Sequence, residues 1–122
     1  MTNARLGPYR LLRPLGRGGM GQVYAALDER LAQEVAVKVL LDEAHEARFL
    51  QEARALCQID HPGVVRVFTV DSPPPYLVME LLHGETLRAY LERAGPLTPS
   101  VATQLGQQLA DAMAAVHLRG II

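Results

Sequence analysis

The sequence contains little of what would direct a chain to a membrane, a metal centre or an oxidising compartment. Its only cysteine is Cys57, so no disulfide can form within the chain and no cysteine-based metal cluster is available. No apolar run approaches the roughly 18 residues that span a bilayer. The first five residues lack the apolar stretch of a signal peptide. These absences predict a cytoplasmic chain without a membrane segment or a metal site, and leave open a membrane segment downstream in a full-length form.

Charge of one sign is also lacking. The net charge is −1 and acids and bases are interspersed, which excludes the basic patch typical of a nucleic-acid-binding protein. Of the 12 basic residues only Lys38 is a lysine. Its place is either chance or a position that needs a compact ammonium rather than a planar guanidinium. With 122 residues, 49% of them hydrophobic, the chain is long enough for one packed domain.

The hydrophobic pattern changes near residue 83. Before this point, period-2 and short apolar segments predict five strands, at residues 9–15, 23–27, 34–40, 64–70 and 76–82. A 3.6-residue period predicts one helix over 43–58. Beyond this point the pattern predicts helices over 86–93 and 98–117, the second with Thr98 as its N-cap. The sequence therefore predicts an α+β fold.

A cluster of four glycines lies between the first two predicted strands: Gly16, Gly18, Gly19 and Gly21. A Walker A loop is excluded because Gln22 follows the last glycine where a lysine is required. A dinucleotide fingerprint should lead into a helix, whereas a strand-like segment follows here. A glycine hairpin over the phosphates of ATP requires a valine two residues after the last glycine and a lysine on the next strand. Val23 and Lys38 meet this requirement, and a plain glycine-rich hairpin without function is the remaining alternative.

Residues 9–122 resemble the first part of a bacterial eukaryotic-like Ser/Thr protein kinase domain. The resemblance rests on motifs in matching order and spacing: Gly-Arg-Gly-Gly-Met-Gly at 16–21, Val-Ala-Val-Lys at 35–38, Phe-Leu-Gln-Glu-Ala at 49–53, His-Pro-Gly-Val-Val at 61–65 and Leu-Val-Met-Glu at 77–80. It implies a short tail over 1–8 and a kinase N-lobe over 9–82, with a five-stranded antiparallel sheet and one packed helix. Residues 83–122 would be the hinge exit and the first two helices of a truncated C-lobe.

The resemblance also implies an ATP site. Lys38 matches the lysine that contacts the α- and β-phosphates, and Glu52 matches its ion-pair partner on the helix; the alternative for Glu52 is a solvated helix acid. The glycine cluster would cover the phosphates. Apolar side chains would enclose the adenine ring, and their alternative role is ordinary core packing: Leu15, Val23, Ala36 and Met79. The hinge backbone at Glu80 and Leu82 would bond the adenine edge.

The family's His-Arg-Asp catalytic loop would follow directly after Ile122. We therefore expect no catalytic residue in this chain, and expect the Mg²⁺ ligands in the missing half. Two functions stay open: the ATP-binding part of a kinase that phosphorylates protein hydroxyls, and a naturally truncated module that binds nucleotide or a partner kinase without catalysis. The apolar stripe of the last helix predicts self-association or a covering partner: Leu105, Leu109, Ala112, Met113 and Val116.

Overall fold

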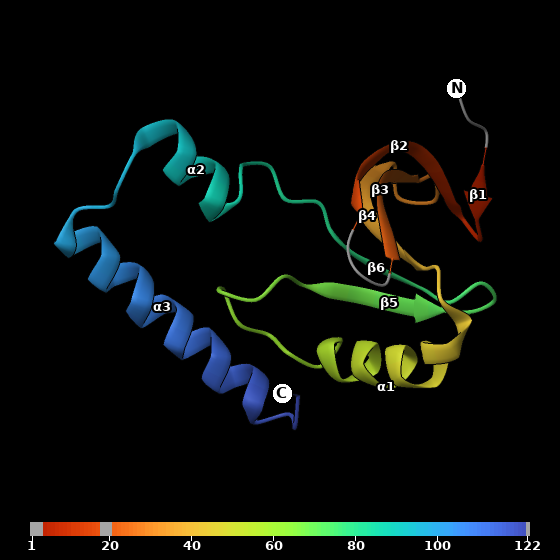
Figure 1. The fold of residues 1–122 in the computed structure, drawn as a ribbon. Helices are drawn as coiled ribbons and strands as arrows, with labels where there is room; N and C mark the ends of the chain where they lie inside the picture. Colours follow the sequence, from red (N-terminus) through yellow and green to blue (C-terminus); the bar gives the residue numbers. More distant parts are fainter. Residues whose placement is uncertain (1–3, 18–20, 122) are drawn as a thin grey trace.

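The computed structural model describes residues 4–17 and 21–121. These residues form a curled antiparallel sheet packed on one helix, and then a helical arm that lies to one side of the sheet (Figure 1). The strands are β1 (Arg5–Leu6), β2 (Tyr9–Arg17), β3 (Gly21–Asp28), β4 (Gln33–Leu40), β5 (Val67–Asp71) and β6 (Tyr76–Glu80). The helices are η1 (Glu43–His45), α1 (Glu46–Leu56), α2 (Leu87–Ala94) and α3 (Pro99–His117).

The sheet has the strand order β1-β2-β3-β4-β6-β5, and every neighbouring pair is antiparallel. The connection from β4 through α1 brings the chain to the far edge, so that β6 returns between β4 and β5. The described chain has six strands where the sequence predicted five. The additional strand, β1, lies within the predicted tail and folds back onto β2 through a turn at Gly7, whose φ is 55°.

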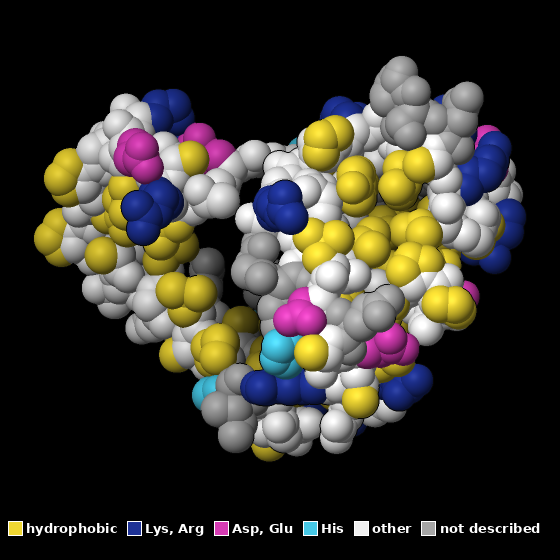
Figure 2. Space-filling view, turned by 45° about the vertical axis from the view of Figure 1, so that its right-hand side comes forward, with side chains coloured by type: hydrophobic (Ala, Val, Ile, Leu, Met, Phe, Trp, Pro, Cys, Tyr) yellow, Lys and Arg dark blue, Asp and Glu magenta, His cyan; other side chains and the backbone are white. Residues whose placement is uncertain are grey.

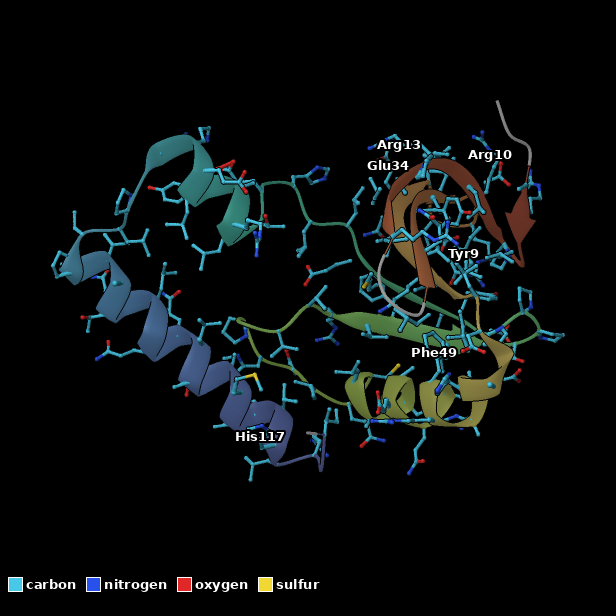
Figure 3. All side chains as sticks on the ribbon, viewed as in Figure 1. Tyr9, Arg10, Arg13, Glu34, Phe49 and His117 are labelled. Carbon is cyan, nitrogen blue, oxygen red and sulfur yellow. The ribbon has the colours of Figure 1, made fainter. Side chains whose placement is uncertain are left out.

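The alternation along β4 divides the core into two clusters on opposite faces of the sheet. Val35 and Val37 point to one face, where a cluster includes Tyr9, Tyr76 and Val78. Leu40 points to the other face, where its cluster includes residues of α1, β5 and β6: Phe49, Ala53, Val67 and Leu77. Figure 3 shows Phe49 between α1 and the sheet, and 6% of its surface is exposed. The helix therefore covers the face of β4 that also carries Ala36 and Lys38.

Several element boundaries differ from the predicted ones by a few residues, among them β6, which ends at Glu80 rather than at residue 82. At two boundaries a side chain takes the place of a backbone partner. The predicted helix over 43–58 begins as the 3-10 turn η1, where the Asp42 carboxylate accepts a hydrogen bond from the Ala44 N–H at 3.0 Å. The strand predicted over 64–70 begins only at Val67. Before it, the Arg66 N–H donates to the Glu80 carboxylate at 2.9 Å, instead of to a neighbouring strand.

The helical arm consists of α2 and α3, each with a threonine N-cap. Thr86 Oγ1 accepts from the Ala89 N–H at 3.0 Å, and Thr98 Oγ1 accepts from the Val101 N–H at 3.3 Å. The arm exposes many hydrophobic side chains (Figure 2), among them Leu87, Tyr90, Leu91, Val101, Leu109 and Met113. No helix in the described part of the chain is long and apolar enough to cross a bilayer.

Candidate functional site

A row of directly opposed residues crosses the middle of the sheet. Gly16 on β2 lies opposite Val23, Val23 lies opposite Lys38, and Lys38 lies opposite Leu77 on β6. Opposed residues of antiparallel strands share a face, so Gly16, Val23 and Lys38 are on the side of the sheet that Leu77 and α1 occupy. The sheet register thus brings together Gly16, Val23 and Lys38, which are far apart in the sequence.

A second row runs parallel to the first on the same face. Ala36 lies opposite Ala25 on one side and opposite Met79 on the other. Ala36 is 4% exposed, and Met79 packs partly buried against the cluster beneath α1. The side chains predicted to line the adenine, Val23, Ala36 and Met79, therefore share one apolar face beside Lys38.

Gly21, the first residue of β3, lies close against the backbone of β4. A Cβ atom at Gly21 would lie 2.5 Å from the Val39 carbonyl oxygen, so only glycine fits between β3 and β4 here. The same position lies 3.6 Å from Cε of Lys38, so the lysine stem runs alongside Gly21. The Gln22 side-chain amide donates to the Gly16 carbonyl at 2.5 Å and ties the two strands of the hairpin together. Gly18 and Gly19 lie outside the described residues.

Lys38 and Glu52 are not joined in this structure. The Arg48 Nε–H donates to Glu52 Oε1 at 3.0 Å, one helical turn earlier on α1, and the Glu52 side chain is 47% exposed. Lys38 is half-buried, and within the described residues no ion pair joins it to a carboxylate. Phe49 and Ala53, which flank Glu52, are the buried residues of α1. The pairing of Lys38 with Glu52 stays a prediction.

The remaining predicted positions lie at the edge of this face. Leu15 falls in an irregularity of β2 between Pro14 and Gly16 and is 46% exposed. Leu82, beyond the end of β6, is 67% exposed. Glu80 ends β6, and its carboxylate is engaged by the Arg66 N–H. The Glu80 side chain is therefore bonded to the segment before β5, and the backbone contacts expected of Glu80 and Leu82 stay a prediction.

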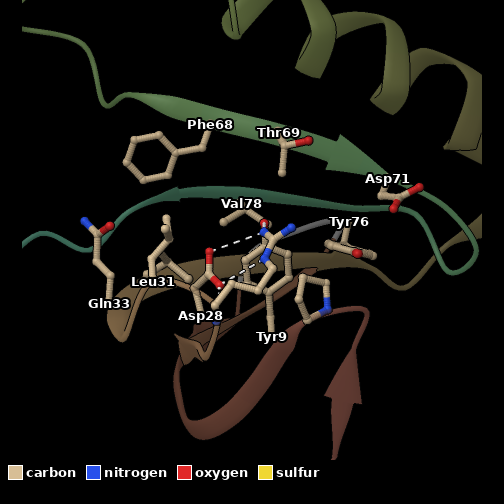
Figure 4. A pocket seen from close by; sticks show the side chains of 12 residues that line it. Tyr9, Asp28, Leu31, Gln33, Phe68, Thr69, Asp71, Tyr76 and Val78 are labelled. Atoms are coloured by element: carbon tan, nitrogen blue, oxygen red, sulfur yellow. Dashed lines mark hydrogen bonds and ion pairs between the residues drawn. The ribbon is translucent and has the colours of Figure 1, made fainter.

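A cavity of about 490 Å³ lies on the opposite face of the sheet (Figure 4). Its walls include Val35 and Val78, which alternate with the residues of the candidate site. Asp28 lines this cavity with its side chain 6% exposed, and the pKa of its carboxyl is lowered chiefly by hydrogen bonds from the Arg30 guanidinium. This cavity is separate from Lys38. Among the described residues there is also no cluster of three histidine, cysteine or acidic side chains that could hold a metal ion.

Sequence reasoning missed three contacts of this region: Gln22 with Gly16, Arg48 with Glu52, and Arg66 with Glu80. The spacing of four residues between Arg48 and Glu52 was a signal, because i,i+4 side chains are neighbours on a helix. The other two contacts depend on strand register and on the path of the loop before β5. No local sequence pattern predicts the strand register or the path of this loop.

Comparisons with known proteins agree on the family. Residues 9–122 match the protein kinase domain. The chain is 45% identical over 123 residues to the serine/threonine-protein kinase pkn2 of Myxococcus xanthus, covering 95% of this chain and 15% of the relative. It is 37% identical over 123 residues to the serine/threonine-protein kinase PrkC of Bacillus subtilis, covering 95% of this chain and 19% of the relative.

A comparison with solved structures finds a similar fold. The solved structure of PpkA-294 in its apo form superimposes with a TM-score of 0.67 at 24% sequence identity, covering 77% of this chain and 42% of the other. The chain thus spans a minor part of the relatives that it matches. The family match over residues 9–122 shows that the chain belongs to the protein kinase domain family.

Proposed function

We propose that this chain is the ATP-binding part of a Ser/Thr protein kinase, with an N-lobe over residues 9–82 and the start of a C-lobe over 83–122. The observation that carries the proposal is the position of Lys38. Its stem passes 3.6 Å from the Cβ position of Gly21, and it shares its face of the sheet with Val23, Ala36 and Met79. A cation beside a glycine hairpin and next to an apolar surface suits a nucleotide with a charged and an aromatic end.

Each part of the site has a physical role. Glycine lets backbone N–H groups approach phosphate oxygens closely, and the Lys38 ammonium supplies a compact positive charge for the α- and β-phosphates. Val23, Ala36, Met79 and the more exposed Leu15 would enclose the adenine ring by apolar contact. The backbone of Glu80 and Leu82 would bond the adenine edge. Since ATP is a cytoplasmic cosubstrate, we place the site in the cytoplasm.

Phosphoryl transfer to a protein hydroxyl requires further groups. Mg²⁺ neutralises charge on the phosphates, and a carboxylate aligns the attacking hydroxyl. The aspartates after Lys38 in the described chain each bond to another group of the chain: Asp42, Asp60, Asp71 and Asp111. We infer that this chain alone does not transfer phosphate, and that the Mg²⁺ ligands belong to the part of the kinase domain that the relatives carry in addition.

A second candidate function is a module that binds nucleotide or a partner kinase without catalysis. The exposed apolar side chains of the helical arm favour it, because a partner or a second copy would cover them. The two candidates differ in whether the reading frame beyond the codon for Ile122 encodes a His-Arg-Asp catalytic loop. They also differ in whether a longer product phosphorylates protein substrates.

The test of ATP binding is titration calorimetry with Mg²⁺-ATP on the 122-residue chain. We expect weak binding that falls by at least about tenfold in Lys38→Met, the order of one charge-assisted hydrogen bond. Arg54→Met is the matched control, because Arg54 is an exposed cation on α1 and the charge change is the same. Equal losses in both variants would show a nonspecific charge effect and would contradict the proposed site. Labelled ATP with a general protein substrate should give no transfer with this chain.

A further inference from the structure

The cavity of about 490 Å³ on the face of the sheet opposite Lys38 has the size of a small-molecule pocket (Figure 4). We refer to it as the Tyr9–Phe68 cavity, and none of its lining residues belongs to the proposed ATP site. We propose that the Tyr9–Phe68 cavity binds a small organic amine, with the apolar body of the ligand beside Phe68 and its protonated amino group at Asp71. The proposal does not rest on ATP binding.

The Tyr9–Phe68 cavity is formed by the curl of the sheet. In the strand order, β2 and β6 are separated by β3 and β4, and in a flat sheet they would lie roughly 14 Å apart. The ring centroids of Tyr9 on β2 and Tyr76 on β6 are nonetheless 6.3 Å apart, in an edge-to-face arrangement at 76°. Val35 and Val78, both buried, also line the hollow. Its walls are therefore packed side chains of the sheet itself.

A bulge in β5 turns Phe68 toward the cavity. The register with β6 shifts between Val67 and Thr69, so Phe68 is an extra residue in the strand. Phe68 and Thr69 consequently both line the cavity, although they are consecutive. Phe68 is 46% exposed, and Leu31, at the same end of the cavity in Figure 4, is 68% exposed. Two large apolar side chains that water still reaches would lose exposed area against the apolar body of a ligand.

The charges that line the cavity favour a cation. Arg30 is the only basic residue among the described lining residues, and its guanidinium is bonded to Asp28, with Nε 3.3 Å from Oδ1 and Nη2 3.3 Å from Oδ2. The Asp28 side chain is 6% exposed and also accepts from the Arg30 backbone N–H at 3.0 Å. The two charges offset each other, which leaves the carboxylate of Asp71 as the net charge of the lining. An ammonium group would be attracted to it, and an anion repelled.

Asp71 lies at the end of the cavity away from Phe68 (Figure 4). The two residues are separated by roughly 10 Å along β5. Asp71 is opposite Tyr76 in the register, and its Oδ1 accepts from the Ser72 N–H at 2.8 Å. This bond orients the carboxylate, while its other lone pairs can still accept from an ammonium group. The apolar end and the anionic end together suit an amine on a short apolar chain, such as phenylbutylamine.

The proposal is tested by nuclear magnetic resonance titration of the ¹⁵N-labelled 122-residue chain. Three probes share one apolar body and differ in the charge of the head group: phenylbutylamine, phenylbutanol and phenylbutyrate. We expect saturable shifts of the backbone amides of β5 and β6, with the highest affinity for the amine and the lowest for the acid. An alcohol that binds as tightly as the amine would overturn the proposal. Shifts concentrated on α2 and α3, whose exposed apolar side chains offer a nonspecific surface, would overturn it as well.

Replacement of Asp71 tests the anionic end. Asp71→Asn removes the charge and keeps an oxygen that can accept from the Ser72 N–H. The affinity for phenylbutylamine should fall about fivefold, the order of one hydrogen bond at an exposed site, and the affinity for phenylbutanol should stay the same. Asp60→Asn is the matched control, because Asp60 is an exposed aspartate that lines a different cavity. Equal losses of amine affinity in the two variants would show a nonspecific charge effect and overturn the proposal.

Phe68→Ala tests the apolar end and distinguishes a ligand from a second copy of the chain. It should weaken binding of the amine and the alcohol alike, and leave the mean mass in sedimentation unchanged. A lower mean mass in Phe68→Ala, in a chain that does not bind the amine, would identify a second copy as the occupant and overturn the proposal. Saturating Mg²⁺-ATP should leave the amine affinity unaltered, whereas competition would place the amine in the nucleotide site and contradict the proposal.

Discussion

Replacement of Gly21 by alanine tests the close approach of β3 and β4 beneath the glycine hairpin. The new Cβ would lie 2.5 Å from the Val39 carbonyl oxygen, and ordinary contact begins at 3.4 Å, so the atoms must separate by about 0.9 Å. The clash is with backbone, so no side-chain rotation relieves it and the two strands must move apart. Overpacking of this kind costs about 1–3 kcal/mol. The reduced freedom of alanine in the unfolded chain offsets roughly 0.4–1 kcal/mol of this.

We therefore expect Gly21→Ala to destabilise the chain by about 1–2 kcal/mol. With a urea m-value of roughly 1–1.5 kcal/mol/M, the unfolding midpoint falls by about 1 M. Gly16→Ala is the matched control, because its Cβ position meets no atom within 4 Å and its φ lies outside the left-handed region. Its free energy of unfolding should rise by roughly 0.4–1 kcal/mol, because the unfolded-chain effect applies there without a clash, while ATP affinity falls because the backbone no longer approaches the phosphates. Equal midpoints for Gly21→Ala and the unsubstituted chain would refute the reasoning.

Three further outcomes follow from the same geometry. The Arg30 hydrogen bonds lower the pKa of Asp28, so the stability that this carboxylate contributes is present above its ordinary pKa near 4 and is lost as pH falls through the lower folded value; urea midpoints measured down that acid range should fall more steeply for the unsubstituted chain than for Asp28→Asn. Glu52→Gln should weaken ATP binding in calorimetry, and Glu46→Gln on the same helix should not; equal affinities for the two variants would place Glu52 outside the site. Leu109, 58% exposed on the arm, should promote self-association, so light scattering should show a smaller mean mass for Leu109→Ser, and a clean monomer before substitution would contradict this.

The sheet and its faces were predictable because strand alternation is a local property. Residues 34–40 alternate strictly, and the structure places Val35 and Val37 in one cluster and Leu40 in the other, as the period of two requires. The N-caps Thr86 and Thr98 were predictable for the same reason, since the side-chain oxygen of a threonine before a helix needs only a backbone N–H of the first turn as its donor. The two-residue strand β1 was missed because it is too short to show a period.

Contacts between distant segments were not predictable. His61 and Asp111 lie 50 positions apart, and their bond depends on where the chain between α1 and β5 lies relative to α3. The kinase resemblance predicts that Glu52 pairs with Lys38 on β4, and in the structure its carboxylate binds Arg48 on its own helix. Which partner Glu52 holds depends on the distance between α1 and β4, and this distance is set by tertiary packing rather than by helix register.

The central claim, that the phosphates of ATP lie beside Lys38, has an unusually direct test because the chain has only one lysine. An acyl-phosphate derivative of ATP transfers its acyl group to an amine held next to its phosphates, and peptide mass spectrometry then locates the label. We expect a label on Lys38 that is suppressed by excess ATP but not by excess AMP, which lacks the distal phosphates. Labelling confined to the N-terminal amine, or labelling of Lys38 that excess ATP leaves unchanged, would contradict the proposed site.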